Sequence, residues 1–270
     1  MFVSSDAPDF DPGRAMPMAV SMRGVGKAYD NGLVALERLD LDVRRGEFVS
    51  LVGASGCGKS TALRIIAGLI TPTSGEVQVN SRSGHQGHAI GFVFQEPTLM
   101  PWSNVRENVR LPLKLAHQSV QQSTERVHDA LAKVGLLEFA DAYPRELSGG
   151  MKMRVSLARA LVTDPDILLL DEPFAALDEI TRFRLNNDLL ELWRTLRKTI
   201  VFVTHSVFES VYLSQRVVVM APRPGRVSAE FRIKASEPRG DDFRSSVEYL
   251  HACRDVSLAL AHVGDLRGRT

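Results

Sequence analysis

The sequence has few cysteines and no long apolar run. Only Cys57 and Cys253 occur in 270 residues, which argues against a disulfide framework and fits a reducing compartment. No stretch reaches about 18 consecutive apolar residues, the length of a membrane-spanning helix. Residues 1–14 carry acidic side chains and lack the basic and apolar segments of a secretory signal. We therefore expect a cytosolic protein that reaches a membrane only through a partner.

A strong net charge is also missing. The 33 basic and 32 acidic residues leave a net charge of +1, which argues against nucleic-acid binding over a broad basic face. His85 and His88 have no further ligand type near them, so a solvated loop is favoured over a metal site. Hydrophobic residues make up 44% of the chain, ample for the buried core of one large domain or two small ones.

The most informative stretch is residues 53–61, Gly-Ala-Ser-Gly-Cys-Gly-Lys-Ser-Thr. It follows an apolar, β-branched run at 47–52 and precedes a segment at 62–70 that is typical of a helix. Strand, glycine-rich loop and helix form the context that a phosphate-binding loop of the type G-x-x-x-x-G-K-[ST] requires. The alternative, a glycine-rich turn that happens to contain Lys-Ser, leaves both flanking elements unexplained.

Each residue type in this loop has its own predicted part. Gly53, Gly56 and Gly58 allow positive φ angles and let successive N–H groups approach phosphate oxygens. The helix that begins here directs unpaired N–H groups at the same anion. Lys59 would place a charge on the β- and γ-phosphates, and Ser60 would ligate Mg²⁺. The predicted phosphate contacts are Gly53, Ala54, Ser55, Gly56, Cys57, Gly58, Lys59, Ser60 and Thr61.

A second apolar run, residues 167–170, ends in Asp171 and Glu172. An aspartate that emerges from a buried strand beside a phosphate loop can hold Mg²⁺, and the adjacent glutamate can polarise an attacking water. The alternative is a strand-end turn in which Asp171 caps a neighbouring group. Because the phosphate loop already predicts an acidic metal ligand after a second hydrophobic strand, we favour the catalytic interpretation.

Two more predicted strands end in polar side chains. Residues 89–94 are apolar enough for a central strand and lead into Gln95, and a buried-type strand at 199–204 precedes His205. Strand ends on one edge of a parallel sheet lie close together, and ligands bind there. His205 could thus contact a γ-phosphate, although a histidine after a strand is more often structural.

Residues 147–150, Leu-Ser-Gly-Gly, predict a second helix start that could receive a phosphate. Ser148 is a good N-cap, and Gly149 and Gly150 remove side chains from the first turn. Read alone, the segment is equally consistent with a simple cap. Farther along, Asp178 precedes a helix whose predicted apolar stripe is Ile180, Phe183, Leu189, Leu192, Trp193 and Leu196.

The other segments are predicted from periodicity. Residues 1–17 have none and indicate a disordered leader. Residues 18–22 and 39–43 predict strands, the second antiparallel with one wet face. Tyr29 could stack on a purine base, although an isolated tyrosine is more often ordinary packing.

Helical spacing appears in two further places. Residues 106–115 and 123–134 predict helices of an insertion, and residues 241–263 predict a helical tail of open purpose. The predicted apolar stripe of the insertion is Val127, Ala130, Leu131 and Val134.

Taken together, these motifs resemble the nucleotide-binding subunit of ABC transporters, over about residues 18–231. The residues that carry the resemblance are Gly53 to Thr61, Gln95, Leu147 to Gly150, Leu168 to Glu172, Asp178 and His205. Segments 94–102 and 171–178 are similar to the nitrate, sulfonate and taurine importer ATPases, a group that includes ATPases for a thiamine pyrimidine precursor. Met151 departs from the glutamine of many superfamily members, but methionine is familiar here in this importer group.

The resemblance implies an α/β fold, with a P-loop NTPase core, an antiparallel β subdomain and an inserted α-helical subdomain at about 97–160. The ABC ATPase domain would span 18–235, between the leader and a C-terminal helical extension at 236–270. It also implies a head-to-tail homodimer, with ATP between the phosphate loop of one copy and the Ser148-Gly149-Gly150 helix start of the other.

Roles for single residues follow from the same resemblance. Glu172 would be the general base for water, His205 the γ-phosphate sensor and Gln95 a ligand of Mg²⁺ and water. Asp178 would contact the other copy, and Tyr29 would stack on adenine. The implied Mg²⁺ ligands are Ser60, Gln95 and Asp171. Cys57 adds an expectation: a lowered pKa at the helix N-terminus, so that alkylation inactivates and MgATP protects; buried packing of its side chain carries equal weight.

The resemblance implies partners as well. The helical insertion would transmit ATP-driven closure to a transmembrane permease at the cytoplasmic face of the inner membrane, and an extracytoplasmic solute-binding protein would act indirectly. The alternative is a soluble ABC ATPase that acts on nucleic acid or ribosomes, which the near-neutral charge and the lack of coiled-coil heptads weaken. A P-loop kinase would have no use for residues 147–150.

Overall fold

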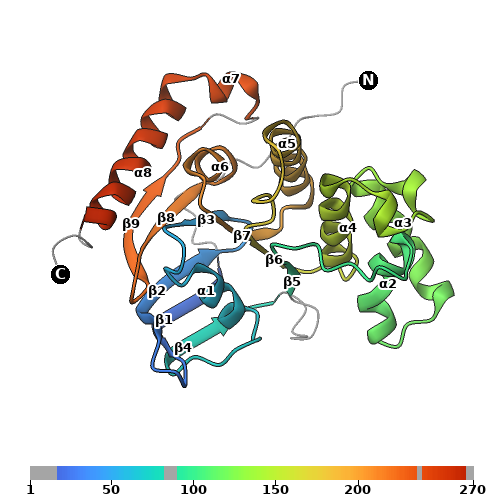
Figure 1. Cartoon of the computed structure of the whole chain (residues 1–270), viewed down its shortest axis with the longest axis horizontal. Coiled ribbons are helices and arrows are strands. Elements are labelled where there is room, and N and C mark those ends of the chain that lie inside the picture. The colour runs from blue at the N-terminus through green and yellow to red at the C-terminus, as the bar shows by residue number, and fades with distance from the viewer. Residues whose placement is uncertain (1–16, 82–89, 236–238, 266–270) are drawn as a thin grey trace.

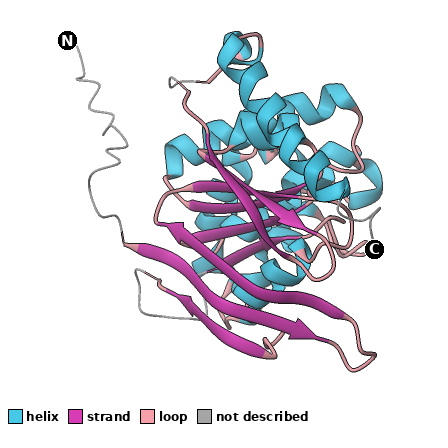
Figure 2. Ribbon diagram, turned by 90° about the vertical axis from the view of Figure 1, so that its left-hand side faces the viewer, coloured by secondary structure: helices cyan, strands magenta, loops and turns pink. Residues whose placement is uncertain are grey.

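The computed structural model describes residues 17–81, 90–235 and 239–265. Nearly all of the predicted leader, and the loop with His85 and His88, lie outside these described residues. The described chain forms two β-sheets with helices packed around them (Figure 1). In Figure 2 most helices lie on one side of the larger sheet and the smaller sheet lies on the other.

The larger sheet has six strands in the order β5-β6-β7-β3-β8-β9, and neighbours are parallel except β8 and β9. The strands are β3 (Phe48–Val52), β5 (Ile90–Val93), β6 (Ile167–Asp171), β7 (Thr199–Thr204), β8 (Arg216–Ala221) and β9 (Arg226–Arg232). Every residue of β3, β6 and β7 is buried, because both faces are covered. In β6, for example, Leu168 and Leu170 join one core, while Ile167 and Leu169 join the other.

The strand predicted as central, β5, lies at the sheet edge. One of its faces is nevertheless covered by α4 (Gly149–Leu161), so closely that a Cβ on Gly91 would lie 2.7 Å from the backbone oxygen of Ala160. Phe92 and Phe94 stack with ring centroids 4.4 Å apart. The apolar composition of this strand therefore reflects a covering helix rather than strands on both sides.

The smaller sheet is antiparallel, with the order β2-β1-β4. Its strands are β1 (Met18–Ala28), β2 (Val34–Arg44) and β4 (Ser74–Val79). The predicted alternation is confirmed: Leu39, Leu41 and Val43 are buried while Asp40 is exposed. Helix α1 (Lys59–Ile66) contacts strands of both sheets and shares one apolar core with them. It ends before the predicted residue 70, because Gly68 takes a φ of +70°.

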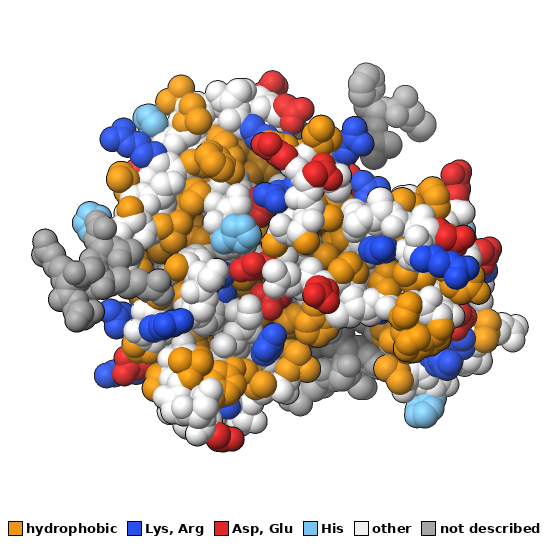
Figure 3. Space-filling model, viewed as in Figure 1, with side chains coloured by type: hydrophobic (Ala, Val, Ile, Leu, Met, Phe, Trp, Pro, Cys, Tyr) orange, Lys and Arg blue, Asp and Glu red, His pale blue; other side chains and the backbone are white. Residues whose placement is uncertain are grey.

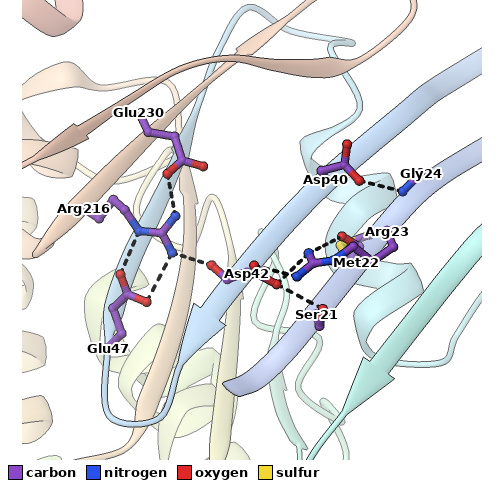
Figure 4. A network of polar contacts seen from close by, with 9 residues as sticks. All are labelled: Ser21, Met22, Arg23, Gly24, Asp40, Asp42, Glu47, Arg216 and Glu230. Atoms are coloured by element: carbon purple, nitrogen blue, oxygen red, sulfur yellow. Dashed lines mark hydrogen bonds and ion pairs between the residues drawn. The ribbon is translucent and has the colours of Figure 1, made fainter. Parts of the chain in front are cut away.

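A charged network joins the two sheets (Figure 4). Arg216, at the start of β8, donates from Nε to Oε1 of Glu47 at 2.8 Å and pairs with Glu230 of β9 at 2.9 Å. The same guanidinium donates to the backbone oxygen of Asp42 in β2, and the Asp42 carboxylate pairs with Arg23 of β1 at 2.7 Å. Strands from both sheets thus converge on one guanidinium.

A helical segment lies beyond the β5 edge of the larger sheet, on the right in Figure 1. Its elements are α2 (Val105–Leu115), α3 (Val120–Lys133), two short 3₁₀ turns (Leu137–Phe139 and Pro144–Glu146) and α4. The predicted stripe is confirmed, since Val127, Ala130, Leu131 and Val134 are all buried. The segment therefore has an apolar core continuous with that of the sheet.

The remaining helices are α5 (Glu179–Leu196), α6 (Val207–Leu213), α7 (Asp241–Arg244) and α8 (Val247–Asp265). Helix α8 lies along α6, β8 and β9 (Figure 1). Ile180 and Phe183, predicted in the α5 stripe, are exposed, because the first turn of α5 extends past the core that its later residues Leu189 and Trp193 cover. Across the described ranges, no helix has both the length and the apolar character needed to cross a membrane.

Candidate nucleotide-binding site

Three glycines shape the loop after β3: the positive φ predicted at Gly56 and Gly58 is confirmed, whereas that predicted at Gly53 is wrong, and close contacts require glycine there instead. A Cβ on Gly53 would lie 2.7 Å from both the backbone oxygen of Met220 and Sγ of Cys57. Gly58 has a φ of +89°, and a Cβ there would lie 2.5 Å from Cδ2 of Leu36. Strand β8, through Met220, and strand β2, through Leu36, therefore restrict the course of the loop.

Helix α1 begins directly in this loop and has no side-chain cap. Its N-cap is Gly58, so no hydroxyl or carboxylate occupies the N–H groups of Lys59, Ser60 and Thr61. Free N–H groups at a helix start, with the positive end of the helix dipole behind them, form a site for an anion such as a phosphate.

The side chain of Lys59 lies within the same loop. It is 4% exposed, and Nζ donates to the backbone oxygens of Gly53 at 2.8 Å and Ala54 at 3.2 Å. Its nearest carboxylate oxygen is Oε1 of Glu172, at 3.8 Å from Nζ. A cation is thus fixed at the centre of the predicted phosphate cradle.

Ser60 and Asp171 meet at the base of the loop. The Ser60 hydroxyl donates to Oδ1 of Asp171 at 2.7 Å. Burial raises the pKa of the Asp171 carboxyl, and the Ser60 hydrogen bond opposes that shift only in part. A hydroxyl next to a desolvated carboxylate is a donor set that suits Mg²⁺, a hard cation that prefers oxygen ligands.

Glu172 lies between a cation and a histidine. Its Oε2 is 3.5 Å from Nδ1 of His205, and its Oε1 faces Lys59. The backbone of Glu172 has a φ of +46°, which is uncommon for a residue with a Cβ, and its N–H donates to the oxygen of Val203 at 3.0 Å. Strained backbone of this kind is typical of functional sites.

Gln95 and Tyr29 lie at the margin of this group. Gln95 follows β5, beside the strand that carries Asp171, and is exposed. Tyr29 is half-buried in the β1–β2 turn, with Nζ of Lys27 5.4 Å from its ring centroid. Within the described residues, no hydrogen bond joins either side chain to the phosphate loop, so their predicted roles stay predictions.

The other predicted residues form a second group, at the starts of α4 and α5. Ser148 is the N-cap of α4 and accepts from the N–H of Met151 at 3.3 Å, and Asp178 caps α5 by accepting from Thr181 at 2.9 Å. A Cβ on Gly150 would lie 2.7 Å from Cγ2 of Thr181, so the two helix starts touch. In the described parts of the chain, no hydrogen bond or ion pair connects this group to residues 53–61.

The expected reactivity of Cys57 is wrong. Its side chain is fully buried, and burial raises the pKa of the thiol more than the nearby Lys59 lowers it. The alternative of buried packing is confirmed, with Sγ lying below the loop against Gly53. We now expect slow alkylation with or without nucleotide.

Sequence reasoning missed Arg159. This α4 residue donates to the backbone oxygens of Pro97 and Thr98, each at 2.8 Å, and so fixes the loop that follows Gln95. Burial lowers the pKa of its guanidinium. Nothing in the sequence distinguishes Arg159 from the other basic residues of α4, Lys152 and Arg154, or indicates its partner loop.

Comparison with known proteins places this site in a family. Residues 36–175 match the model of the ABC transporter family, which spans the phosphate loop, Gln95 and the strand that ends in Asp171. The chain belongs to this family as an ATP-binding subunit, and it is an ATPase. The resemblance and the fold class inferred from the motifs are thereby confirmed.

Particular relatives sharpen the placement. The chain is 48% identical to the nitrate import ATP-binding protein NrtD of Synechocystis sp., over 77% of this chain and 78% of that protein. It is 42% identical to the taurine import ATP-binding protein TauB of Rhizobium johnstonii, over 88% and 94%. Among solved structures, it is similar to the dimeric post-hydrolysis state of the ATP-binding cassette MJ0796 bound to ADP and Pi, with a TM-score of 0.70, 35% identity, and coverage of 80% and 100%.

Proposed function

We propose that this chain is the ATP-hydrolysing subunit of an importer that takes up a small solute through a separate permease. The observation that carries the proposal is the position of the Glu172 carboxylate between Nζ of Lys59 and Nδ1 of His205. Its two oxygens face an ammonium group and an imidazole nitrogen, beside a loop shaped for phosphate. This arrangement supports hydrolysis of a terminal phosphoanhydride rather than nucleotide binding alone.

In the proposed reaction, Glu172 takes a proton from a water molecule as the water oxygen bonds to the γ-phosphorus. The bond between the γ-phosphorus and the bridging oxygen breaks, and ADP leaves with the electron pair. Lys59 and the α1 N–H groups stabilise the charge on the phosphate oxygens, and His205 binds the γ-phosphate. Tyr29 stacks on the adenine ring.

The residues that would hold Mg²⁺ are Ser60 and Asp171, joined by Gln95. The 2.7 Å distance between the Ser60 hydroxyl and Oδ1 of Asp171 supports this role, because two oxygen ligands already lie side by side. When bound, the ion would neutralise charge on the phosphates.

The second group supports a head-to-tail dimer. The α4 start leaves the N–H groups of Gly149 and Gly150 uncapped, because Ser148 occupies that of Met151. Ser148 and Asp178 are exposed, and they belong to loops that touch each other. A second copy of the chain would bring this group over the phosphate loop, as the dimeric relative suggests.

The permease would dock beside the Gln95 loop. A groove of about 640 Å³ lies between β5 and α2, with Phe94, Leu115 and Arg159 among its walls. Trp102 and Leu115 are 76% and 72% exposed, and Figure 3 shows hydrophobic side chains gathered over this helical segment. Exposed apolar groups of this size mark protein interfaces. Arg159, which bonds the loop and lines the groove, would link docking to the nucleotide.

The named relatives support nitrate or taurine as the kind of solute, and the motif resemblance adds other sulfonates and a thiamine precursor. An extracytoplasmic binding protein would deliver it, and the chain would lie at the cytoplasmic face of the inner membrane. The test is to purify tagged Glu172→Gln protein with MgATP from solubilised native membranes and identify its partners. A co-purified multispanning permease supports the proposal. Recovery of only ribosomes or nucleic acid would overturn the transport assignment while leaving ATP hydrolysis in place.

A further inference from the structure

Two charged side chains close to the site have no part in the reaction described above. Glu209, on α6, is 7% exposed, and Arg182 lies opposite it on α5. Their facing atoms, Nε of Arg182 and Oε1 of Glu209, are 3.7 Å apart, and each is buried without a hydrogen-bond partner. Unbonded charged atoms in the interior are costly and uncommon, so this pair calls for a functional explanation.

The other ends of the two side chains reach the two loops of the site. Nη2 of Arg182 donates to the backbone oxygen of Leu177, the residue before Asp178, at 2.9 Å. Oε2 of Glu209 accepts from the hydroxyl of Thr204, the residue before His205, at 2.6 Å. Each side chain therefore holds one loop with one atom and faces the other side chain with another.

The Thr204 hydroxyl also contacts the backbone after His205. Its oxygen accepts a hydrogen bond from the N–H of Ser206 at 3.0 Å, while its O–H donates a hydrogen bond to Glu209. One hydroxyl thus connects the residues before and after His205. Any shift of the Glu209 carboxylate is passed to the backbone that carries the imidazole.

We propose that Arg182 and Glu209 are positioning residues that join the Asp178 loop to the His205 loop, and that they form a direct hydrogen bond when ATP closes the site. The inference rests on the roles proposed above for His205 and Asp178. A relative shift of roughly 1 Å brings Nε and Oε1 within the distance of a charge-assisted hydrogen bond. Movement of the Asp178 loop on closure then also moves the His205 loop.

The C-terminal helices lie near this pair, in which Glu209 is buried and the Arg182 side chain is 30% exposed. The pair lies beside a pocket of about 480 Å³ whose walls include Phe208 and Tyr212. Oη of Tyr249, on α8, donates to the backbone oxygen of Phe208 at 3.0 Å, and the guanidinium of Arg244, on α7, lies 3.7 Å from the ring centroid of Tyr212.

The test compares Arg182→Gln and Glu209→Gln in the purified full chain. We expect kcat for ATP hydrolysis to fall about tenfold in each, with KM for ATP within about twofold of the wild type, a coupling of ordinary size between sites. Without nucleotide the midpoint of thermal unfolding should fall in both variants, and more in Arg182→Gln, because that change also removes the hydrogen bond to the backbone oxygen of Leu177. The rise of the midpoint on adding MgATP should become smaller in both variants.

The double variant separates a joined pair from two independent residues. If the side chains act through each other, Arg182→Gln with Glu209→Gln loses no more kcat than the slower single variant. Arg184→Gln and Glu248→Gln are matched controls at exposed positions of α5 and α8, and both should keep wild-type kcat. Single variants within twofold of the wild type, or losses that multiply in the double variant, would overturn the inference.

The wild-type protein distinguishes this inference from the proposed function. If the wild type hydrolyses ATP and Glu172→Gln does not, the proposed reaction holds. In that case, wild-type kcat in the Arg182→Gln and Glu209→Gln variants would contradict the inference alone. If Glu172→Gln keeps wild-type hydrolysis, the proposed function and the inference fall together.

Discussion

Helices α1 and α4 both begin at glycine-rich loops, yet their surroundings differ. The α1 start is uncapped, packed against Leu36 and surrounded by charged groups, among them Lys59 and Asp171. The α4 start carries a serine cap, and Ser148 and Gly149 are exposed. The first has the charges and rigidity that chemistry on a phosphate needs, and the second has only N–H groups and an open face. The difference supports the proposal that the α4 start completes the site of another copy.

The largest effect should come from the group beside α1. Glu172→Gln keeps the shape of the side chain and removes the base, so we expect kcat to fall by about 10²- to 10⁴-fold while ATP still binds. The variant should accumulate as an ATP-bound dimer, visible by light scattering with MgATP. Glu138→Gln, at an exposed position in the helical segment, serves as the control. Near-normal phosphate release by Glu172→Gln would remove that residue from its role.

A mixing experiment tests whether the two helix starts belong to different copies. Lys59→Ala disables the first group and Ser148→Arg blocks the second, so each variant alone should be inactive. In a mixed dimer one site combines both intact groups, and equal mixing should restore up to about a quarter of the wild-type activity if sites work independently. Activity no greater than the sum of the separate variants would contradict a shared site.

The glycines of the two starts should differ in their effect on stability. Gly58→Ala forces a side chain into positive φ and against Leu36, so we expect a loss of about 2–3 kcal/mol in the free energy of unfolding. Gly149→Ala meets only the flexible end of Leu177, at 3.2 Å, and should stay within about 0.5 kcal/mol. Urea unfolding of both variants gives the comparison. Equal losses would mean that the two starts are equally constrained.

The smallest effect concerns the buried charge of Asp171. Burial raises the pKa of this carboxyl, so the folded state binds its proton more tightly than the unfolded state does. Stability therefore falls as the pH rises from the unfolded-state pKa through the folded-state pKa. Asp171→Asn keeps an acceptor for Ser60 and removes the charge. We expect the nucleotide-free variant to have a higher midpoint of thermal unfolding than the wild type at pH 7, where each kcal/mol gained corresponds to about 2–4 °C. The gain should be smaller at pH 5. Thermal unfolding at both pH values checks this, and an unchanged or lower midpoint at pH 7 would contradict it.

The sequence predicts what depends on short segments and fails where distant parts of the chain meet. The phosphate loop and the carboxylates after β6 could be predicted, because the backbone conformation they need is dictated by neighbours in the sequence. The choice between a reactive and a buried Cys57 could not be made, nor could the edge position of β5, since both depend on packing and strand order between distant parts of the chain. The contact between Arg182 and Glu209 is of the same kind, because it joins two helices that a whole strand separates.

The network around Arg216 has a consequence that concerns heat. Charged groups are hydrated less favourably as temperature rises, so the cost of keeping Arg216 and Glu47 out of water decreases, while the apolar packing that holds α2 and α3 gains nothing comparable. We therefore expect that, on warming, the helical segment loosens before the joint between the two sheets does.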